Sequence, residues 1–324
     1  MNLRQLELFA EVARHGSLSH AATALRIGQP ALSRHIRALE VELRRNLFHR
    51  NGRGVVLTEA GARFLSYAQG AMSQLESGRA ALDGVDSDAI GRVVVGMPPS
   101  IARALTVPLV RSFQARYERA QIAITEGLSA SLQDQLLTGR LDVAVVHNPA
   151  SSSVLRIEPL LQEALCLLSR VDDAQPFAQA STVKLSALAG LRLISPANPH
   201  PIRILIEAEA AKQGVPLHFA LEIDALGSIP DLVRAGCGHA VVPESVLWGE
   251  QGFPGLAVRT LVRPQVRSNV ALVTASRRPS TLLVNGTEVM VRDLLRSAAA
   301  RSREAGGPDA APATRVAARK MARR

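Results

Sequence analysis

The stretch "QPALSRHIRALEVEL", residues 29–43, repeats apolar side chains at the interval of an α-helix. Four of them follow one another at spacings of four, three and four residues: Leu32, Ile36, Leu39 and Leu43. This spacing places them on one side of a helix, so the pattern predicts a helix that is half buried in a core. The polar side chains of Ser33, Arg34 and Arg37 lie off this stripe. They are therefore expected on the side of the helix that faces away from the core.

The residues before this stretch predict two shorter helices and a tight turn. Apolar side chains recur at helical spacing over residues 3–13, and Gly16 is a typical helix end because glycine tolerates the left-handed backbone found there. Ser17 is a favourable N-cap for a second helix. The three residues 26–28 then lead directly into the opening stretch. Two helices joined by a glycine-containing turn are typical of a helix-turn-helix, whose second helix lies in the DNA major groove.

The side chains at the start of the second helix suit contact with bases. Gln29 can pair with adenine through two hydrogen bonds, and Arg34 or Arg37 can pair in the same way with guanine. Ser33 can reach a base edge or a phosphate, and Pro30 is compatible with a first helical turn. Read in isolation, the same residues would also suit an ordinary solvated helix face.

A β-hairpin predicted after this helix favours the DNA-binding interpretation. In "NLFHRNGRGVVLTEAG", residues 46–61, two short apolar runs flank the pair Asn51-Gly52, which is a strong signal for a tight turn. Arg50 and Arg53 would then lie on the wing of a winged helix-turn-helix domain over residues 1–60. Arginines in such a place can contact the phosphate backbone or the minor groove.

A long helix is expected over residues 58–88. Its apolar side chains recur near heptad spacing: Phe64, Leu65, Ala68, Met72, Leu75 and Leu82. A helix of about 25 residues is roughly 35 to 40 Å long. Because such a helix extends well beyond a small domain, we expect it to pair with its counterpart from a second chain.

The net charge of +10 is concentrated at the two ends of this 324-residue chain. Residues 1–65 contain 10 arginines and 5 glutamates, whereas acidic and basic residues balance over 66–300. A basic module beside a neutral body indicates a polyanionic partner for the module alone. The last residues, 304–324, are basic and rich in Ala, Gly and Pro, and are expected to form a disordered tail.

The composition argues against an exported or membrane-embedded protein. No run approaches the roughly 18 apolar residues of a membrane span, and the first residues lack the pattern of an export signal. The two cysteines, Cys166 and Cys237, form neither a disulfide framework nor a metal-ligand cluster. A soluble, cytoplasmic protein without a metal or other cofactor is expected.

Residues 2–66 resemble the DNA-binding domain of the LysR-type transcriptional regulators. The resemblance is carried in order by "LELFAEVARHGSLSHAATAL", "QPALSRHIRALEVEL", "LFHR" and "VVLTEAGARFL". It implies the following DNA-contacting residues: Ser17, Gln29, Pro30, Ser33, Arg34, Arg37, Arg50 and Arg53. Gly28 is a departure, since many relatives have Ser or Thr before the Gln-Pro pair; glycine also caps a helix but offers no hydroxyl.

Residues 91–303 alternate apolar runs with amphipathic helices, which predicts an α/β effector domain built on parallel sheets. The resemblance to the family implies an architecture like that of the periplasmic binding proteins, with two subdomains joined by a hinge. The crossovers place subdomain I at 91–165 and 266–303, and subdomain II at 166–265. In such sheets a ligand binds beyond the carboxyl ends of the strands, where helices begin.

The loops at those strand ends contain hydroxyls and histidines, so they favour a small, polar, anionic effector. The expected effector-binding residues are Pro99, Ser100, Ser129, His147, Asn148, His200 and Ser228. Capping of helices and turns explains several of these equally well. The stretches "GMPPS" and "SPANPHPIRILIE" look closest to the branch containing the nitrogen assimilation control protein, which suggests a role in nitrogen or small-carboxylate metabolism.

These observations predict a regulator that binds an inverted-repeat promoter site as a dimer or tetramer, responds to an effector and acts on RNA polymerase. A regulator of the same fold that works by oligomerisation and DNA bending, without an effector, is the alternative. An enzyme is not expected, because the sequence contains no nucleophile elbow, no H-E-x-x-H and no phosphate-binding loop.

Overall fold

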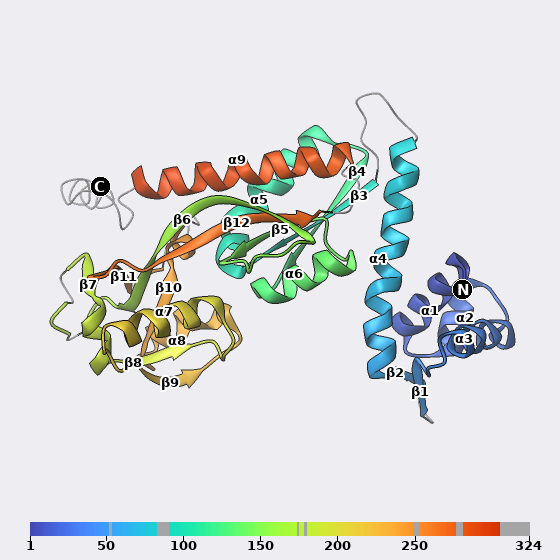
Figure 1. Cartoon of the computed structure of the whole chain (residues 1–324), viewed down its shortest axis with the longest axis horizontal. Helices are drawn as coiled ribbons and strands as arrows, with labels where there is room; N and C mark the ends of the chain where they lie inside the picture. The colour runs from blue at the N-terminus through green and yellow to red at the C-terminus, as the bar shows by residue number, and fades with distance from the viewer. Residues whose placement is uncertain are drawn as a thin grey trace.

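The computed structural model describes residues 1–51, 54–82, 91–173, 175–177, 180–248, 253–276 and 281–304. The N-terminal module contains α1 (Leu3–His15), α2 (Leu18–Leu25), α3 (Gln29–Leu43) and the antiparallel strands β1 (Phe48–Asn51) and β2 (Gly54–Leu57). This arrangement is the predicted winged helix-turn-helix. Figure 1 shows it at one end of the molecule, separated from the larger α/β part by a long helix.

The helix boundaries of the module follow from local capping. Asn2 and Gln5 form a capping box at the start of α1, and Gly16 ends the helix with a left-handed φ of 63°. The Oγ of Ser17 accepts a hydrogen bond from the backbone N–H of His20 and caps α2. The third helix starts after Gly28 without a side-chain cap, and Pro30 lies in its first turn.

The core of the module is built around Phe9, whose ring is fully buried. Its centroid lies 5.3 Å from that of Phe48 on the wing and 5.5 Å from that of Phe64 on the next helix. Glu40 of α3 joins the wing to the same core, because its Oε1 accepts hydrogen bonds from the N–H groups of Leu47 (2.7 Å) and Phe48 (3.2 Å). The position of the wing is therefore fixed relative to α3.

The long helix α4 spans Glu59–Leu82. The sequence predicted it over 58–88, and residues 83–90 lie outside the described part of the chain. Two glycines allow its backbone to approach other elements closely. A Cβ at Gly61 would lie 2.0 Å from the carbonyl oxygen of Leu47, and one at Gly70 would lie 1.9 Å from that of Thr138. The helix thus packs on the wing at one end and on the α/β domain further along.

The α/β domain contains a ten-stranded sheet in the order β4-β3-β5-β12-β6-β10-β8-β9, with β11 beside β6 and β7 beside β11. Its first strands are β3 (Gly91–Met97), β4 (Ala120–Glu126), β5 (Val143–His147), β6 (Leu155–Arg170) and β7 (Thr182–Lys184). The later strands are β8 (Arg192–Ser195), β9 (His218–Glu222), β10 (His239–Pro243), β11 (Leu256–Val262) and β12 (Arg267–Ala275).

The sheet is mixed, and this corrects the prediction of parallel sheets. The strands β3, β4 and β5 are parallel to one another, as are β8, β9 and β10. In contrast, β6 pairs antiparallel with β10, β11 and β12. It pairs with β12 along Leu155–Ala164 and with β10 and β11 along Leu165–Arg170. One strand thus belongs to both subdomains and passes between them, as Figure 1 shows.

Helices cover the sheet on both sides. Subdomain I carries α5 (Pro99–Arg116), α6 (Ser129–Thr138) and α9 (Leu282–Glu304), and subdomain II carries α7 (Pro201–Lys212) and α8 (Ile229–Arg234). Three short 3-10 helices are η1 (Leu185–Gly190), η2 (Leu226–Ser228) and η3 (Glu244–Leu247). In subdomain I, α5 and α9 share one apolar core and α6 contributes to another. Among the described helices, none is long and apolar enough to cross a membrane.

Candidate DNA interface and effector cavity

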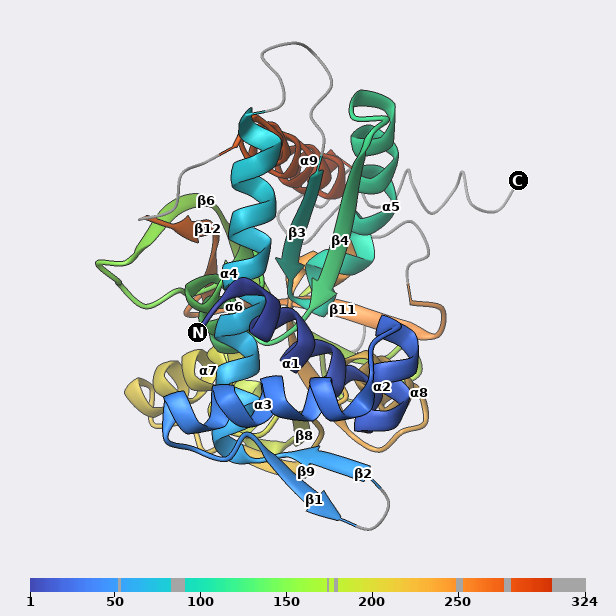
Figure 2. The same ribbon diagram turned by 90° about the vertical axis from the view of Figure 1, so that its right-hand side faces the viewer.

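The third helix presents its polar side away from the core, as its sequence predicts. Leu32, Ile36 and Leu39 are buried, whereas Arg34 and Arg37 are exposed. Figure 2 shows α3 and the β1–β2 hairpin beside one another, and the Glu40 hydrogen bonds to β1 agree with this arrangement. A groove of DNA placed against α3 would therefore meet the wing as well.

The remaining predicted DNA contacts differ in their surroundings. Gln29 and Pro30 are exposed at the start of α3, and Ser33 is half-buried. Ser17 is half-buried and caps α2, so the structure gives it a role within the module. The side chain of Arg50 and the whole of Arg53 lie outside the described part of the chain.

Arg26 is an exposed cation that no motif in the sequence marks as a DNA contact. It follows α2 with a left-handed backbone (φ 53°) and lies two residues before the N-cap of α3. A cation at this place adds to the positive potential at the start of the recognition helix. Its position in a tight turn was visible in the sequence, but a turn residue gives no sign of which way its side chain points.

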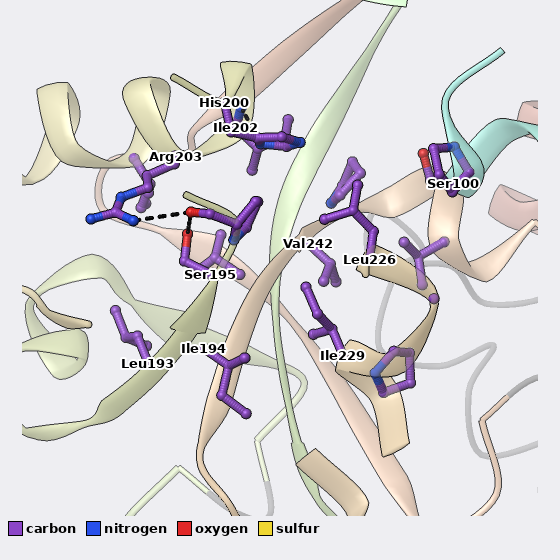
Figure 3. Close-up of a pocket in the computed structure, with 18 of the residues that line it drawn as sticks. Ser100, Leu193, Ile194, Ser195, His200, Ile202, Arg203, Leu226, Ile229 and Val242 are labelled. Atoms are coloured by element: carbon purple, nitrogen blue, oxygen red, sulfur yellow. Dashed lines mark hydrogen bonds between the residues drawn. The ribbon is translucent and has the colours of Figure 1, made fainter. Parts of the chain in front are cut away.

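A cavity of about 140 Å³ lies between the two subdomains. Subdomain I contributes Pro99, Ser100, Arg103 and His147 to its lining. The rest comes from subdomain II, namely Leu193, Ile194, Ser195, Pro196, His200, Ile202, Arg203, Ile206, Phe219, Leu226, Gly227, Ile229, Pro230, Val241, Val242, Pro243, Val246 and Phe253. Figure 3 shows Ser100 on one side of the view, Arg203 on the other, and Leu226, Ile229 and Val242 between them.

The cavity wall is mainly apolar, which differs from the polar pocket predicted from the loops. Its apolar side chains come from strand ends such as Ile194 and Val242 and from the start of α8 at Ile229. Phe219 and Phe253 also line it. The loop sequences gave no sign of this wall because most of its members lie inside strands and helices.

Four of the predicted effector-binding residues line the cavity: Pro99, Ser100, His147 and His200. The other three lie elsewhere. The Oγ of Ser129 accepts a hydrogen bond from the N–H of His147 (3.0 Å). The side chain of Asn148 donates to Ser268 and accepts from the N–H of Asn269. Ser228 is exposed and is not part of the lining.

Two arginines of the lining were missed, because neither stands in a loop. Arg203 is buried in the first turns of α7, where its guanidinium contacts Glu207 (2.9 Å) and Glu222 (2.5 Å) and lies over the ring of Phe219. Burial lowers the pKa of Arg203, but these two carboxylates more than offset that effect, so the net direction is upward. Arg103 is exposed, and its guanidinium lies 4.2 Å from the centre of the Phe253 ring.

His200 caps α7 and is held in its neutral form. Its Nδ1 accepts a hydrogen bond from the N–H of Ile202 (3.3 Å). The pKa of His200 is lowered from 6.5 to about 4, mainly by burial; the nearby His147 acts in the same direction and Asp224 in the opposite one. At neutral pH the ring is therefore an uncharged cap in the cavity wall.

Replacement of His200 by Asn is expected to make the effector domain less sensitive to acid. Because the native state prefers the neutral ring, its stability is complete above pH 6.5 and falls as the pH drops toward 4. After allowance for the partial exposure of the ring, the loss is about 2 kcal/mol. Asn keeps an N-cap acceptor but does not titrate. Thermal unfolding at a series of pH values should show equal Tm at neutral pH and a higher Tm for the variant in acid. If the Tm values of the wild type and the variant fell in parallel as the pH was lowered, His200 would not be the group that makes the domain sensitive to acid.

Among the residues that the structure describes, no group of three or more His, Cys, Asp or Glu side chains is placed to hold a metal ion. The two cysteines are free thiols, with Cys166 buried and Cys237 partly buried.

Comparison with known proteins identifies both parts of the chain. Residues 3–62 match the family described as bacterial regulatory helix-turn-helix protein, lysR family, and residues 87–295 match the LysR substrate binding domain. The nitrogen assimilation regulatory protein nac of Klebsiella aerogenes is 31% identical over 76% of this chain and 79% of its own length. The family and the resemblance predicted from the sequence are thereby confirmed.

Solved structures confirm the fold class. Full-length OxyR from Pseudomonas aeruginosa aligns with a TM-score of 0.68 at 24% identity, covering 91% of this chain and 95% of that one. The LysR family regulator CbnR also aligns with a TM-score of 0.68 at 24% identity, over 91% and 99% of the two chains. With a winged helix-turn-helix, a long connecting helix and a two-subdomain effector domain in place, the chain belongs to the LysR family of DNA-binding transcriptional regulators.

Proposed function

We propose that this regulator binds an inverted-repeat DNA site as a dimer or tetramer in the cytoplasm and acts there on RNA polymerase rather than as an enzyme. Pairing through α4 would place two α3 helices about one DNA turn, roughly 34 Å, apart. A solved structure of the relative CbnR is described as a complex with its target DNA, which supports DNA as the partner. The exposed cations on α3 would provide the contacts.

We further propose that a small molecule in the cavity controls DNA binding. One observation carries this proposal: Ser100 and His147 of subdomain I face an apolar wall that belongs to subdomain II. A ligand held between the two walls would change their relative angle, because β6 and the segment between β11 and β12 connect the subdomains. Ligand binding would then favour one hinge angle over another.

The lining indicates the class of effector. A cavity of about 140 Å³ matches a body of roughly one six-membered ring, since an engineered apolar cavity of about 150 Å³ binds benzene. The sequence led us to expect an anionic effector, and the guanidinium of Arg103 at the rim of the cavity would bind its negative charge. We therefore propose a small organic acid with an apolar body, and not a strongly polar metabolite.

A thermal-shift screen of the full-length protein tests this proposal. One panel would contain acids with apolar bodies, such as benzoate and short branched aliphatic acids; the other would contain the amino-nitrogen compounds suggested by the relative nac. A ligand at about 100 times its Kd adds roughly 2.7 kcal/mol, which raises Tm by several degrees. The first panel is expected to contain the hits.

Two tryptophan variants show whether a hit occupies the cavity. Leu226→Trp places a large ring on the half-exposed part of the lining and should abolish the shift. Ile204→Trp is the matched control, because Ile204 is 51% exposed on α7 of the same subdomain and is not in the lining. Hits from the second panel alone would contradict the proposed class. No hit from either would favour the regulator that works without an effector.

A further inference from the structure

Glu163 is a buried carboxylate at the point where β6 passes from one subdomain to the other. Its exposed fraction is 1%. Its Oε2 accepts a hydrogen bond from the backbone N–H of Ser245 in η3, at 2.6 Å. Its Oε1 has no hydrogen-bond partner of good geometry among the described residues, but it lies 3.1 Å from Nδ1 of His147, which is itself 5% exposed. An ionised carboxylate in such a place requires hydrogen-bond donors around it.

The surroundings of Nδ1 indicate which nitrogen of His147 carries the hydrogen. Besides Oε1 of Glu163, the Oγ of Ser268 lies 3.4 Å from Nδ1, and this oxygen accepts a hydrogen bond from the side chain of Asn148. The carboxylate can only accept toward Nδ1, whereas the Ser268 hydroxyl can either accept or donate. A bare Nδ1 would face the nearer, carboxylate oxygen with a lone pair, so the hydrogen belongs on Nδ1.

The other ring nitrogen faces the effector cavity. Nε2 of His147 lies 3.3 Å from the Oγ of Ser100. In a neutral ring with the hydrogen on Nδ1, Nε2 is an acceptor, so the Ser100 hydroxyl must donate its one hydrogen to Nε2. A carboxylate, a histidine and a serine are ordered in the same way in the serine proteases, where the carboxylate fixes the tautomer.

We propose that Glu163, acting through His147, makes Ser100 a hydrogen-bond acceptor toward the cavity, so that the effector presents a donor there. This inference rests on the proposed function of the cavity. The donor would be a hydroxyl or an N–H group. The expected role of Ser100 as a donor to an anion is thereby replaced, and the negative charge of the effector falls to Arg103. Glu163 is thus a positioning residue that determines specificity without touching the ligand.

Glu163→Gln should reverse this polarity. The N–H of Ser245 needs an acceptor, so the amide oxygen of Gln would take the place of Oε2 and the NH₂ group would face Nδ1 of His147. Nδ1 must then be the acceptor, and the hydrogen moves to Nε2. Ser100 would accept from Nε2 and regain a hydroxyl hydrogen that can point into the cavity.

Nitrogen NMR of histidine-labelled full-length protein measures this directly, because the shifts of the two ring nitrogens show which one is protonated. The signals of His147 are those that disappear in His147→Asn. We expect a protonated Nδ1 and a bare Nε2 in the wild type at pH about 8, and the reverse in Glu163→Gln. Glu158→Gln is the control, since Glu158 also lies on β6 but pairs with Arg292; it should leave His147 unchanged.

A wild-type ring that is doubly protonated, or protonated on Nε2 alone, would overturn the proposal. If Glu163→Gln does not fold, the wild-type spectrum still decides it.

Two probes of similar size test the consequence for binding: benzyl alcohol has a hydroxyl that can donate to Ser100, whereas benzoate has only acceptor oxygens. Relative to the wild type, Glu163→Gln should raise the Kd of benzyl alcohol relative to that of benzoate about tenfold. Failure of both probes to bind would count against the proposed effector class, while the ring protonation would still decide the role of Glu163.

Discussion

Gly61→Ala is expected to unfold the DNA-binding module at a markedly lower temperature and to abolish tight DNA binding. The new Cβ would lie 2.0 Å from the carbonyl oxygen and 2.9 Å from the carbonyl carbon of Leu47. That oxygen accepts the N–H of Thr58, and the N–H of Leu47 donates to Glu40. Relief of the clash must therefore move the segment that joins the wing to α3.

The size of the effect follows from overpacking and from the hydrogen bonds at risk. Overpacking costs about 1 to 3 kcal/mol, and each hydrogen bond contributes about 1 kcal/mol more. A module of some 60 residues has only a few kcal/mol of stability in reserve. Because 1 kcal/mol shifts Tm by about 4 to 8 °C in so small a domain, calorimetry should show a fall of more than 10 °C for the transition of the module.

Gly78→Ala is the matched control in the same helix. A Cβ at Gly78 meets no atom within 4 Å, so the change should stabilise α4 by about 0.5 to 1 kcal/mol through the higher helix propensity of alanine. An unchanged Tm in Gly61→Ala would contradict the packing of α4 on Leu47. A loss of stability in Gly78→Ala would place a second chain against that position.

The DNA-binding module was predictable from the sequence because its determinants are local. The stripe from Leu32 to Leu39, the left-handed end at Gly16 and the cap at Ser17 each act within one or two helical turns, and each is found in the structure. The contact between Glu40 and the wing was not predictable, because it joins residues 7 and 8 positions apart through a loop. A propensity pattern contains no information on such contacts.

The strand β6 shows why the α/β domain was harder to predict. Its 16 residues include Pro159 and contain both half-exposed and fully buried positions, since one part lies in each subdomain. No single period describes such a strand. At Pro159 the register with β12 shifts, which accommodates a residue that cannot donate to a ladder. The alternation of apolar runs and helices therefore predicted parallel sheets and gave no sign of this antiparallel strand.

The position of the cavity between the subdomains was predictable, but the chemistry of its wall was not. The rule that ligands lie beyond strand ends led to Ser100, His147 and His200, which all line the cavity. The same rule also selected Ser129 and Asn148, whose side chains satisfy backbone and side-chain partners nearby. The apolar wall and Glu163 depend on how the subdomains meet, and that arrangement is a property of the tertiary structure.

Arg34→Ala is expected to cause a large and base-specific loss of DNA affinity. Arg34 is exposed on the polar side of α3, close to its N-terminal end, where the residues of a recognition helix reach base edges. An arginine that pairs with guanine contributes about 1 to 3 kcal/mol of discrimination. The substitution removes this pairing from both half-sites of a dimer, so the specific affinity should fall by about 30-fold to 10⁴-fold.

Measurement on a set of duplexes separates base reading from phosphate binding. The consensus site would be selected from random-sequence DNA with the wild-type protein, and each base pair of one half-site would then be varied singly. Arg34→Ala should remove the preference at one base pair and leave the others. Arg53→Ala, at a position that the sequence predicts on the wing, should weaken all duplexes to a similar degree and reduce the slope of log affinity against log salt by about 1 for each phosphate that is no longer neutralised. If Arg34→Ala instead weakened every duplex equally, Arg34 would bind a phosphate, and base reading by α3 would fall to Gln29 and Arg37.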